Sequence, residues 1–369
     1  MKRIILAAFV AVLALTSCNK DNDSVAKGEQ TVVIKLPNAG TKAVEGQVAT
    51  GVSSTISATT NVIFLLSGQG VTATHAFSAT EITAGVKYIE QVPASVDGVV
   101  VLANIPAADL TAVQALGTYT AITGYSFTAA SQNSSVGITD KLMMGEDLTL
   151  TDPGTDPIGD GHDYKQADIT LNSATARMEI GAVYAGTGIA NIELVAVWVN
   201  NFYPTNVATA ATLYPSSDAS WVTTPVAGTD ASASTYTTVN TAVYNPTVYK
   251  DAANAAVTQT PTGSVYAYQV FPGNLPHVIL LVKGQYAPTY FGGTVGEYFL
   301  KYVTFNKYND GSGYISAFAA NNIYKIGVGA TGIEITPDML GDNPELSQFD
   351  LGIEIDVTPW TAVNVTPEI

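Results

Sequence analysis

Short runs of β-branched and aromatic residues, each bounded by Gly or Pro, recur along the whole 369-residue chain. Runs of this length and composition form β-strands, and no period of about 20–50 residues indicates a repeat architecture. Only 107–117 has helical spacing of its apolar residues. The sequence therefore predicts a mainly-β fold of two β-sandwich (transthyretin-like, Greek-key) domains with one or two short helices. The predicted strands are 31–36, 61–67, 86–92, 98–103, a long adjacent pair at 168–185 and 192–199, 264–271, 277–283, 297–305, 322–328 and 351–366.

A stretch rich in Gly, Pro and Asp, residues 151–164, interrupts this pattern and is typical of a linker or a long surface loop. We therefore expect an N-terminal sandwich domain over 43–166 and a C-terminal one over 167–369. Residues 203–263 are poor in charge and rich in Thr, Ala, Ser and Pro, which predicts long surface loops between strands.

The single cysteine lies at an informative position. Residues 1–18 begin with Lys2 and Arg3, continue with an apolar run and end at Cys18. The run is shorter than the ~20 residues that a bilayer-spanning helix needs, so it is typical of a secretory signal. Small residues before Cys18 resemble a bacterial lipobox, in which the Cys becomes the lipid-bearing first residue and 19–30 a polar tether. An ordinary signal peptide that contains a Cys is the alternative.

Charge and cysteine usage exclude some classes of protein. The net charge of −16 comes from 15 basic and 31 acidic residues, and the basic ones form no cluster. A nucleic-acid binder needs clustered Lys and Arg to replace phosphate counterions, so nucleic acid is excluded as a partner. With one Cys the chain has no intrachain disulfide, and its stability must come from packing.

Residues that could carry catalysis are sparse. His75, His162 and His277 lie far apart and form no HxxxH pair. The nucleophile elbow, the HExxH motif and the Walker A motif are all absent from the sequence. We therefore expect neither an enzyme nor a cofactor.

Two binding hypotheses remain open from residue types alone. Four aspartates of the 151–164 loop could surround calcium, although the order of an EF-hand is missing and Asp-Pro and Asp-Gly are common in turns. Four aromatic residues could stack on sugars, although Tyr and Trp are also usual core and rim residues of β-sandwiches. In both cases the structural interpretation is preferred, and no metal site is predicted. The residues are Asp152, Asp156, Asp160 and Asp163, and Tyr184, Trp198, Tyr203 and Trp221.

Several stretches together resemble the fimbrillins, the type V pilus subunits of Bacteroidales. These stretches, together with the lipobox, occur in the same order as in that family and are spread over the whole chain. They are MMGE at 143–146, ITLNSATARMEIGAV at 169–183, YAYQVFPGN at 266–274 followed by HVILLVK, FAANNIYKIGV at 318–328 and VTPW at 357–360.

The resemblance implies a specific route of assembly. Fimbrillins are exported as lipoproteins of the outer membrane, and a trypsin-like protease then cuts after an Arg or Lys in the loop behind the first strand. On this chain the cut falls between Lys42 and Ala43, within the segment 31–42 that holds the first strand and the loop. Many relatives have Arg where this chain has Lys42, which leaves the identity of the protease open. The strand released would carry Val32, Ile34 and Leu36.

Loss of that strand opens a groove, which accepts a strand from the next subunit. The C-terminal tail, 351–369, is the implied donor. Pro359 lacks an N–H and interrupts the tail, so two short strands are expected, with 361–369 as the deeper donor. The implied donor residues are Ile353, Ile355, Val357, Trp360, Val363 and Val365.

The function implied is a structural subunit of a cell-surface fimbria. The protein would be lipid-anchored in the outer membrane before cleavage and part of an extracellular fimbrium afterwards. Its partners would be other copies of itself, other fimbrial subunits, the maturation protease and a ligand on the host surface. The alternatives are a tip or accessory adhesin, which accepts a strand but donates none, and a glycan-binding surface lipoprotein that does not polymerise.

Overall fold

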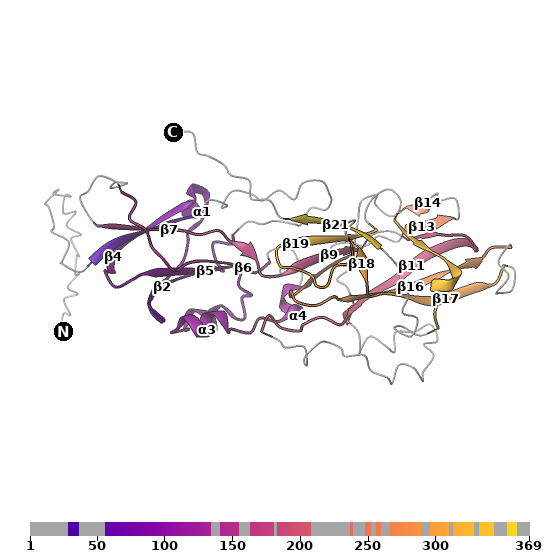
Figure 1. Cartoon of the computed structure of the whole chain (residues 1–369), viewed down its shortest axis with the longest axis horizontal. Coiled ribbons are helices and arrows are strands. Elements are labelled where there is room, and N and C mark those ends of the chain that lie inside the picture. Colours follow the sequence, from indigo (N-terminus) through magenta and orange to yellow (C-terminus); the bar gives the residue numbers. More distant parts are fainter. Residues whose placement is uncertain are drawn as a thin grey trace, which may run out of the picture.

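Two lobes of β-sheet lie end to end along the long axis of the computed structural model (Figure 1). The strands of the first lobe end at Ser173, and those of the second begin at Ala176. The predicted domain boundary at 166–167 therefore falls inside a strand of the first lobe. The structure describes residues 29–36, 56–133, 141–154, 163–180, 183–207, 237–238, 248–251, 256–259, 266–288, 296–309, 313–327, 332–342 and 353–359.

The first lobe is a sandwich of a three-stranded sheet, in the order β4-β1-β7, and a five-stranded sheet, in the order β3-β2-β5-β6-β8. β5 is buried at every position, because both faces of its sheet are covered. Val99 and Val101 point into the core between the sheets, whereas Val100 and Leu102 pack on the other side under helices. The strands are β1 (Glu29–Lys35), β2 (Val62–Ser67), β3 (Gly70–His75), β4 (Val86–Pro93), β5 (Gly98–Ala103), β6 (Met143–Asp147), β7 (Tyr164–Asp168) and β8 (Asn172–Ser173).

Four short helices occur among the described residues of this lobe, where the sequence predicted one over 107–117. That one is α2 (Leu110–Gln114); the others are α1 (Ala79–Ala84), α3 (Tyr119–Thr123) and α4 (Ala129–Gln132). Helices of four to six residues are too short to show an amphipathic stripe, so their signal lies in their caps. Ser78 and Glu81 form a capping box that starts α1, and Gly85 ends that helix at φ 68°.

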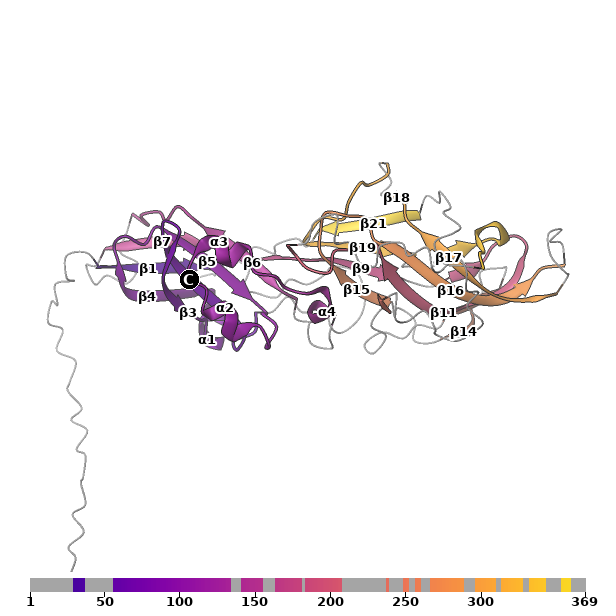
Figure 2. The same cartoon turned by 90° about the horizontal axis from the view of Figure 1, so that it is seen from below.

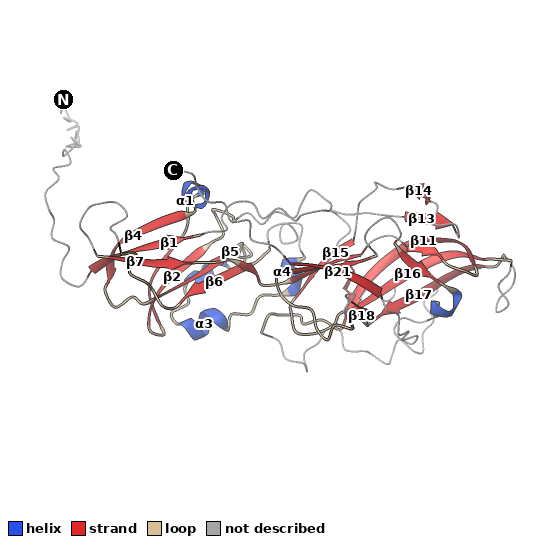
Figure 3. Ribbon diagram, turned by 45° about the horizontal axis from the view of Figure 1, so that its top comes forward, coloured by secondary structure: helices blue, strands red, loops and turns tan. Residues whose placement is uncertain are grey.

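The second lobe packs a sheet in the order β15-β9-β19-β21-β18 against one in the order β14-β13-β11-β16-β17, with β12 beside β11 (Figure 3). A parallel pair, β10-β20, and the 3₁₀-helix η3 (Pro337–Met339) complete it. The strands are β9 (Ala176–Ile180), β10 (Val183–Ala185), β11 (Ile189–Asn200), β12 (Thr237–Thr238), β13 (Val248–Asp251), β14 (Ala256–Gln259), β15 (Tyr266–Val270), β16 (His277–Tyr286), β17 (Tyr298–Phe305), β18 (Tyr308–Asn309), β19 (Asn322–Ile326), β20 (Ile333–Ile335) and β21 (Ile353–Pro359).

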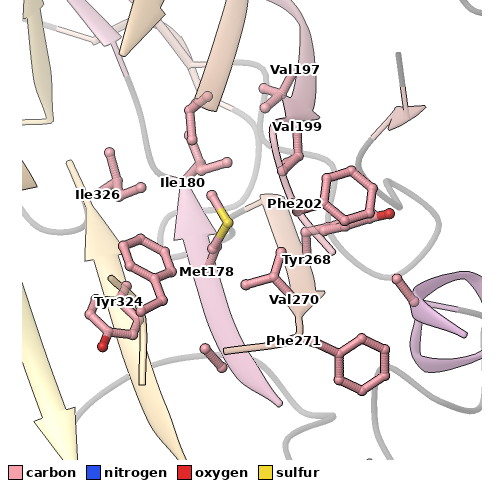
Figure 4. Packing of buried hydrophobic residues seen from close by; sticks show 14 of the residues in the cluster. Met178, Ile180, Val197, Val199, Phe202, Tyr268, Val270, Phe271, Tyr324 and Ile326 are labelled. Carbon is pink, nitrogen blue, oxygen red and sulfur yellow. The ribbon is translucent and has the colours of Figure 1, made fainter. Parts of the chain in front are cut away.

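The core of the second lobe is apolar and aromatic (Figure 4). Met178 of β9 and Tyr324 of β19 come from one sheet, and Val197 and Val199 of β11 come from the facing sheet. The ring of Tyr324 stacks on that of Phe318 with centroids 3.8 Å apart. The same cluster continues without a break to the residues under α2 and α3, so the two lobes share one apolar core.

Two predictions about strands are wrong. The segments 168–185 and 192–199 are not one adjacent pair: the first is broken into β8, β9 and β10, and β9 lies in the sheet opposite β11. Ile180 and Val183 are both buried although they are three residues apart. Side chains alternate between the two faces of a strand, so one continuous strand would place residues at this odd spacing on opposite faces. Within 203–263, where only loops were predicted, β12 and β13 pair with β11, and β14 pairs with β13.

Asn133, next to α4, joins the two lobes. Its side-chain Oδ1 accepts from the backbone N–H of Gln269 at 2.6 Å, and its Nδ2 donates to the Gln269 carbonyl at 2.8 Å. Gln269 belongs to β15, an edge strand, so the amide supplies the two hydrogen bonds that a neighbouring strand would make. Asn206, which follows β11 of the second lobe, bonds to the first lobe. Its Oδ1 accepts from the N–H of Phe127, and its Nδ2 donates to the carbonyl of Tyr125.

Replacing Asn133 by Ala should lower the free energy of unfolding by about 1–3 kcal/mol, because the N–H and the carbonyl of Gln269 lose their hydrogen bonds. Urea denaturation measures this. Gln114→Ala, at an exposed position of α2, is the control and should change stability by less than about 0.5 kcal/mol. Equal effects of the two substitutions would show that Asn133 does not hold the junction.

Candidate functional site

β1 is the middle strand of the three-stranded sheet (Figures 2 and 3). It pairs antiparallel with β4, from Glu29 opposite Pro93 to Lys35 opposite Val86. On its other side it pairs parallel with β7, from Thr31 opposite Tyr164 to Lys35 opposite Asp168. β4 and β7 do not pair with each other, so removal of β1 alone would leave both of them with an unpaired edge that faces a gap.

The side chains of β1 fill the core of the first lobe. Val32 and Ile34 are 0% exposed and Leu36 is 4% exposed, and all three belong to one apolar cluster with residues of β2 and β5. Burial of each such side chain contributes roughly 1.5–3 kcal/mol. The three residues predicted to leave with the strand therefore lie together on one buried face, and their loss would expose apolar surface along the length of the gap.

Polar contacts fix the two ends of β1. Gln30 is buried, and its Nε2 donates to the carbonyls of Val96 at 2.9 Å and Pro93 at 3.4 Å. At the other end the N–H of Leu36 donates to the carbonyl of Gly85 at 2.8 Å. Sequence reasoning missed Gln30, although its i, i+2 spacing from Val32 could have placed it on the same inward face.

A small charged cluster lies along the β4 side of β1. Lys87, opposite Ile34, forms an ion pair with Glu81 of α1 at 2.7 Å. Burial opposes ionisation of Glu81, but hydrogen bonds from Lys87 and Ser78 and the charge of Lys87 together lower its pKa. His75 lies opposite Ile63, on the face of its sheet that looks into the sandwich. Burial, and secondarily the charge of Lys87, lower the pKa of His75 below 6.5.

Of the predicted donor residues, the structure describes the backbone of three, in the second lobe. Ile353, Ile355 and Val357 lie in β21, which pairs antiparallel with β19 and parallel with β18 of its own sheet. Pro359 ends the strand opposite Asn322. The neighbouring Asn321 donates its N–H to the carbonyl of Thr175, so the chain leaves β21 at the junction between the lobes.

Several predicted site residues lie outside the described part of the chain. The lipidation site, the cleavage site and the end of the tail are among them, so their roles stay predictions, as does the donor role of β21. They are Cys18, Lys42, Ala43, Trp360, Val363 and Val365.

Of the other candidate residues, those that the structure describes do not lie together as a site, and Trp221 is outside the described residues. Tyr184 precedes β11 and hydrogen-bonds Glu334 at 3.1 Å, whereas Tyr203 follows β11 and lies against Gly273, so the 12-residue strand separates them. Asp152 and Asp163 are described, but Asp156 and Asp160 are not. In the described ranges no three His, Cys, Asp or Glu residues lie together as metal ligands, and no helix is long and apolar enough to cross a membrane.

Comparison with solved structures gives the fold. No family model and no curated protein matches the sequence. A "putative cell adhesion protein" of Parabacteroides distasonis superposes with a TM-score of 0.53 at 16% identity, covering 92% of this chain and 99% of that one. A second protein of that name and organism gives 0.51 at 12% identity, covering 91% and 100%.

The chain has the fold of these Bacteroidales proteins. The mainly-β, sandwich-like fold that the sequence predicts is thereby confirmed over nearly the whole chain. A fimbrilin of Porphyromonas gingivalis gives a TM-score of 0.47 at 15% identity, covering 92% of this chain and all of that one, a likeness too low to argue from.

Ile34→Ala should lower the free energy of unfolding by about 2–5 kcal/mol, since it leaves a cavity in the middle of the first lobe. Lys35→Ala, the adjacent and exposed position on the same strand, should change it by less than about 0.5 kcal/mol. Urea denaturation of both variants measures the difference, and similar values for the two would mean that β1 does not hold the lobe together.

Stability should fall as the pH drops through about 6.5. The folded-state pKa of His75 lies below that of the unfolded chain, so the unfolded state takes up the proton first, and the contribution of neutral His75, present above about pH 6.5, is lost on acidification. His75→Gln should show a smaller loss between about pH 8 and pH 5.5 in chemical denaturation. Glu81 titrates at lower pH and is common to both proteins, so identical pH profiles would refute this assignment.

Proposed function

We propose that the chain is a structural subunit of a cell-surface fimbria, which polymerises when β1 is removed and a strand of another copy takes its place. The observation that carries the proposal is the position of β1 between β4 and β7, with Val32, Ile34 and Leu36 in the core. The likeness in fold to proteins named for cell adhesion, and the resemblance of sequence motifs to fimbrillins, support the same function.

The physical basis is the instability of a sandwich that lacks an inner strand. Loss of three buried side chains exposes surface worth about 5–9 kcal/mol by the same scale. The inward N–H and C=O groups of β4 and β7 lose their hydrogen bonds at the same time. An extended segment with alternating apolar residues would restore both the buried apolar surface and the backbone hydrogen bonds, as in β-strand addition. Since donor and acceptor are different surfaces, the contact is heterologous, and it generates a filament when the rotation between successive copies does not close a ring.

Processing would control when this happens. The chain from β1 to β2 passes through Lys42, so a cut after that residue separates β1 from the rest of the protein covalently but leaves it held by its contacts. We infer export as a lipoprotein with its lipid on Cys18, and cleavage by a trypsin-like protease outside the cell. Before the cut, β1 fills its own groove, and premature polymerisation is suppressed.

The end of the chain is the proposed donor. Residues 353–359 are paired within the second lobe as β21, and this supports 361–369 as the proposed donor. A tip or accessory subunit is the second candidate, because such a protein keeps its C-terminal strand in its own fold, as β21 is kept here. The two candidates differ in one property: a stalk subunit both accepts and donates, whereas a tip subunit only accepts.

Limited proteolysis with trypsin should convert the monomer into a polymer, detected by size-exclusion chromatography and electron microscopy. Lys42→Gln should stay uncleaved at this bond and remain monomeric. The chain without 361–369 should be cleaved yet remain monomeric, and it should still cap the growing end of full-length polymer.

The outcomes separate the candidates. Cleavage of the full-length chain without polymerisation, combined with capping of a polymerising relative, would identify a tip subunit. Polymerisation of the truncated chain would show that 361–369 is not the donor. Polymerisation of Lys42→Gln at the wild-type rate would contradict the role of this cleavage.

A further inference from the structure

The groove that β1 fills is polar at one end. There the Nε2 of Gln30 donates to the carbonyl of Val96 at 2.9 Å, and both residues are buried, at 5% and 3% exposure. Among the described residues, no other group donates to that carbonyl. A strand without a side-chain donor at this position would leave a buried acceptor unpaired, which is costly. This end of the groove therefore discriminates between strands whose apolar residues fit equally well.

A β-bulge on β4 lies at the same end of the groove. Two residues of β4, Glu90 and Gln91, lie opposite the single residue Thr31 of β1. Gln91 has a φ of 57°, a left-handed conformation that Gly adopts readily and that other residues adopt at a cost. A bulge pins the register of a sheet, because a regular ladder cannot slide past it. The bulge and the Gln30 contact thus fix one register for the strand between β4 and β7.

Building on the proposed strand exchange, we propose that this polar end selects the direction and register of the incoming tail. The tail carries two valines, Val363 and Val365, at the spacing of the buried residues Val32 and Ile34. Only two placements of the tail put both valines at these two positions, one in each chain direction.

The two placements differ at the position of Gln30. In the direction of β1, which is parallel to β7, Thr361 takes this position, and its hydroxyl is a hydrogen-bond donor. In the opposite direction Pro367 takes it, and the Pro side chain has no donor. The incoming tail therefore runs in the direction of β1, with Thr361 as its specificity-determining residue.

Competition between two peptides tests the role of Thr361. The full-length chain, cut at Lys42, is incubated with an excess of a wild-type peptide of residues 360–369 and an equal amount of a variant, and mass spectrometry measures the ratio bound. Thr361→Val keeps the shape but removes the donor, so it should bind about fivefold less. Thr361→Gln has the longer reach of Gln30 and should bind about threefold more. A purely apolar site would instead favour Thr361→Val.

Thr366 supplies the matched control. In the proposed register it takes the position of Lys35, which is exposed, so its hydroxyl faces solvent. Thr366→Val should therefore change the ratio of bound peptides by less than about twofold.

Disulfide trapping tests the direction. Lys35 lies opposite Val86 of β4, and its position would be taken by residue 366 in the direction of β1 but by residue 362 in the opposite one. The chain carries Val86→Cys, and Cys18→Ser removes its native cysteine. A peptide with Thr366→Cys should form a disulfide with it and a peptide with Ala362→Cys should not, because a disulfide requires Cα atoms within about 7 Å.

The outcomes separate this proposal from the strand exchange on which it rests. If Thr361→Val binds as well as the wild-type peptide, or if Ala362→Cys is trapped in place of Thr366→Cys, the proposal fails while strand exchange stands. If neither the wild-type tail peptide nor a peptide of residues 29–36 displaces β1, strand exchange fails and this proposal fails with it.

Discussion

The structure depends most on the two-sided pairing of β1. A strand at the edge of a sheet can be lost with one row of hydrogen bonds, but β1 holds β4 and β7 at the same time and fills the core beneath them with Val32 and Ile34. The first lobe therefore needs a strand at this place, although not this strand. Residues 36–61 connect β1 to β2 covalently, and under the proposed function a single cut among them would make β1 exchangeable.

Much of the packing in the rest of the molecule does not involve β1, so the proposed exchange would leave it in place. The five-stranded sheet of the first lobe is buried on its second face by α2 and α3, and this packing continues into the core of the second lobe. Asn133 and Asn206 tie the lobes with side-chain amides in place of a continuous strand. In the proposed exchange the protein would keep its second lobe while its first lobe changes one strand.

The sequence was sufficient for the strands whose residues alternate or are uniformly apolar. β5, with six buried residues, and β16 follow from composition and turn signals alone, and so does the inward set of β1. The sheet assignment of β9 could not be predicted, because the reversal of face between Ile180 and Val183 depends on tertiary pairing. The central position of β1 could not be predicted either, because a local sequence pattern does not reveal pairing with β7, which is more than 120 residues away. For Gln30, the spacing from Val32 indicates the inward face, but its acceptors, Pro93 and Val96, are distant in sequence and could not be predicted.

The most direct test is the composition of the polymer itself. Polymer assembled from protein cut at Lys42 should be washed, denatured and measured by mass spectrometry for the fragment that ends at Lys42 and contains β1. Exchange of strands predicts that this fragment is absent from the polymer and recovered in the supernatant, while the remainder of the chain is retained. Retention of one fragment per subunit would contradict the account, because β1 would then still fill its own groove.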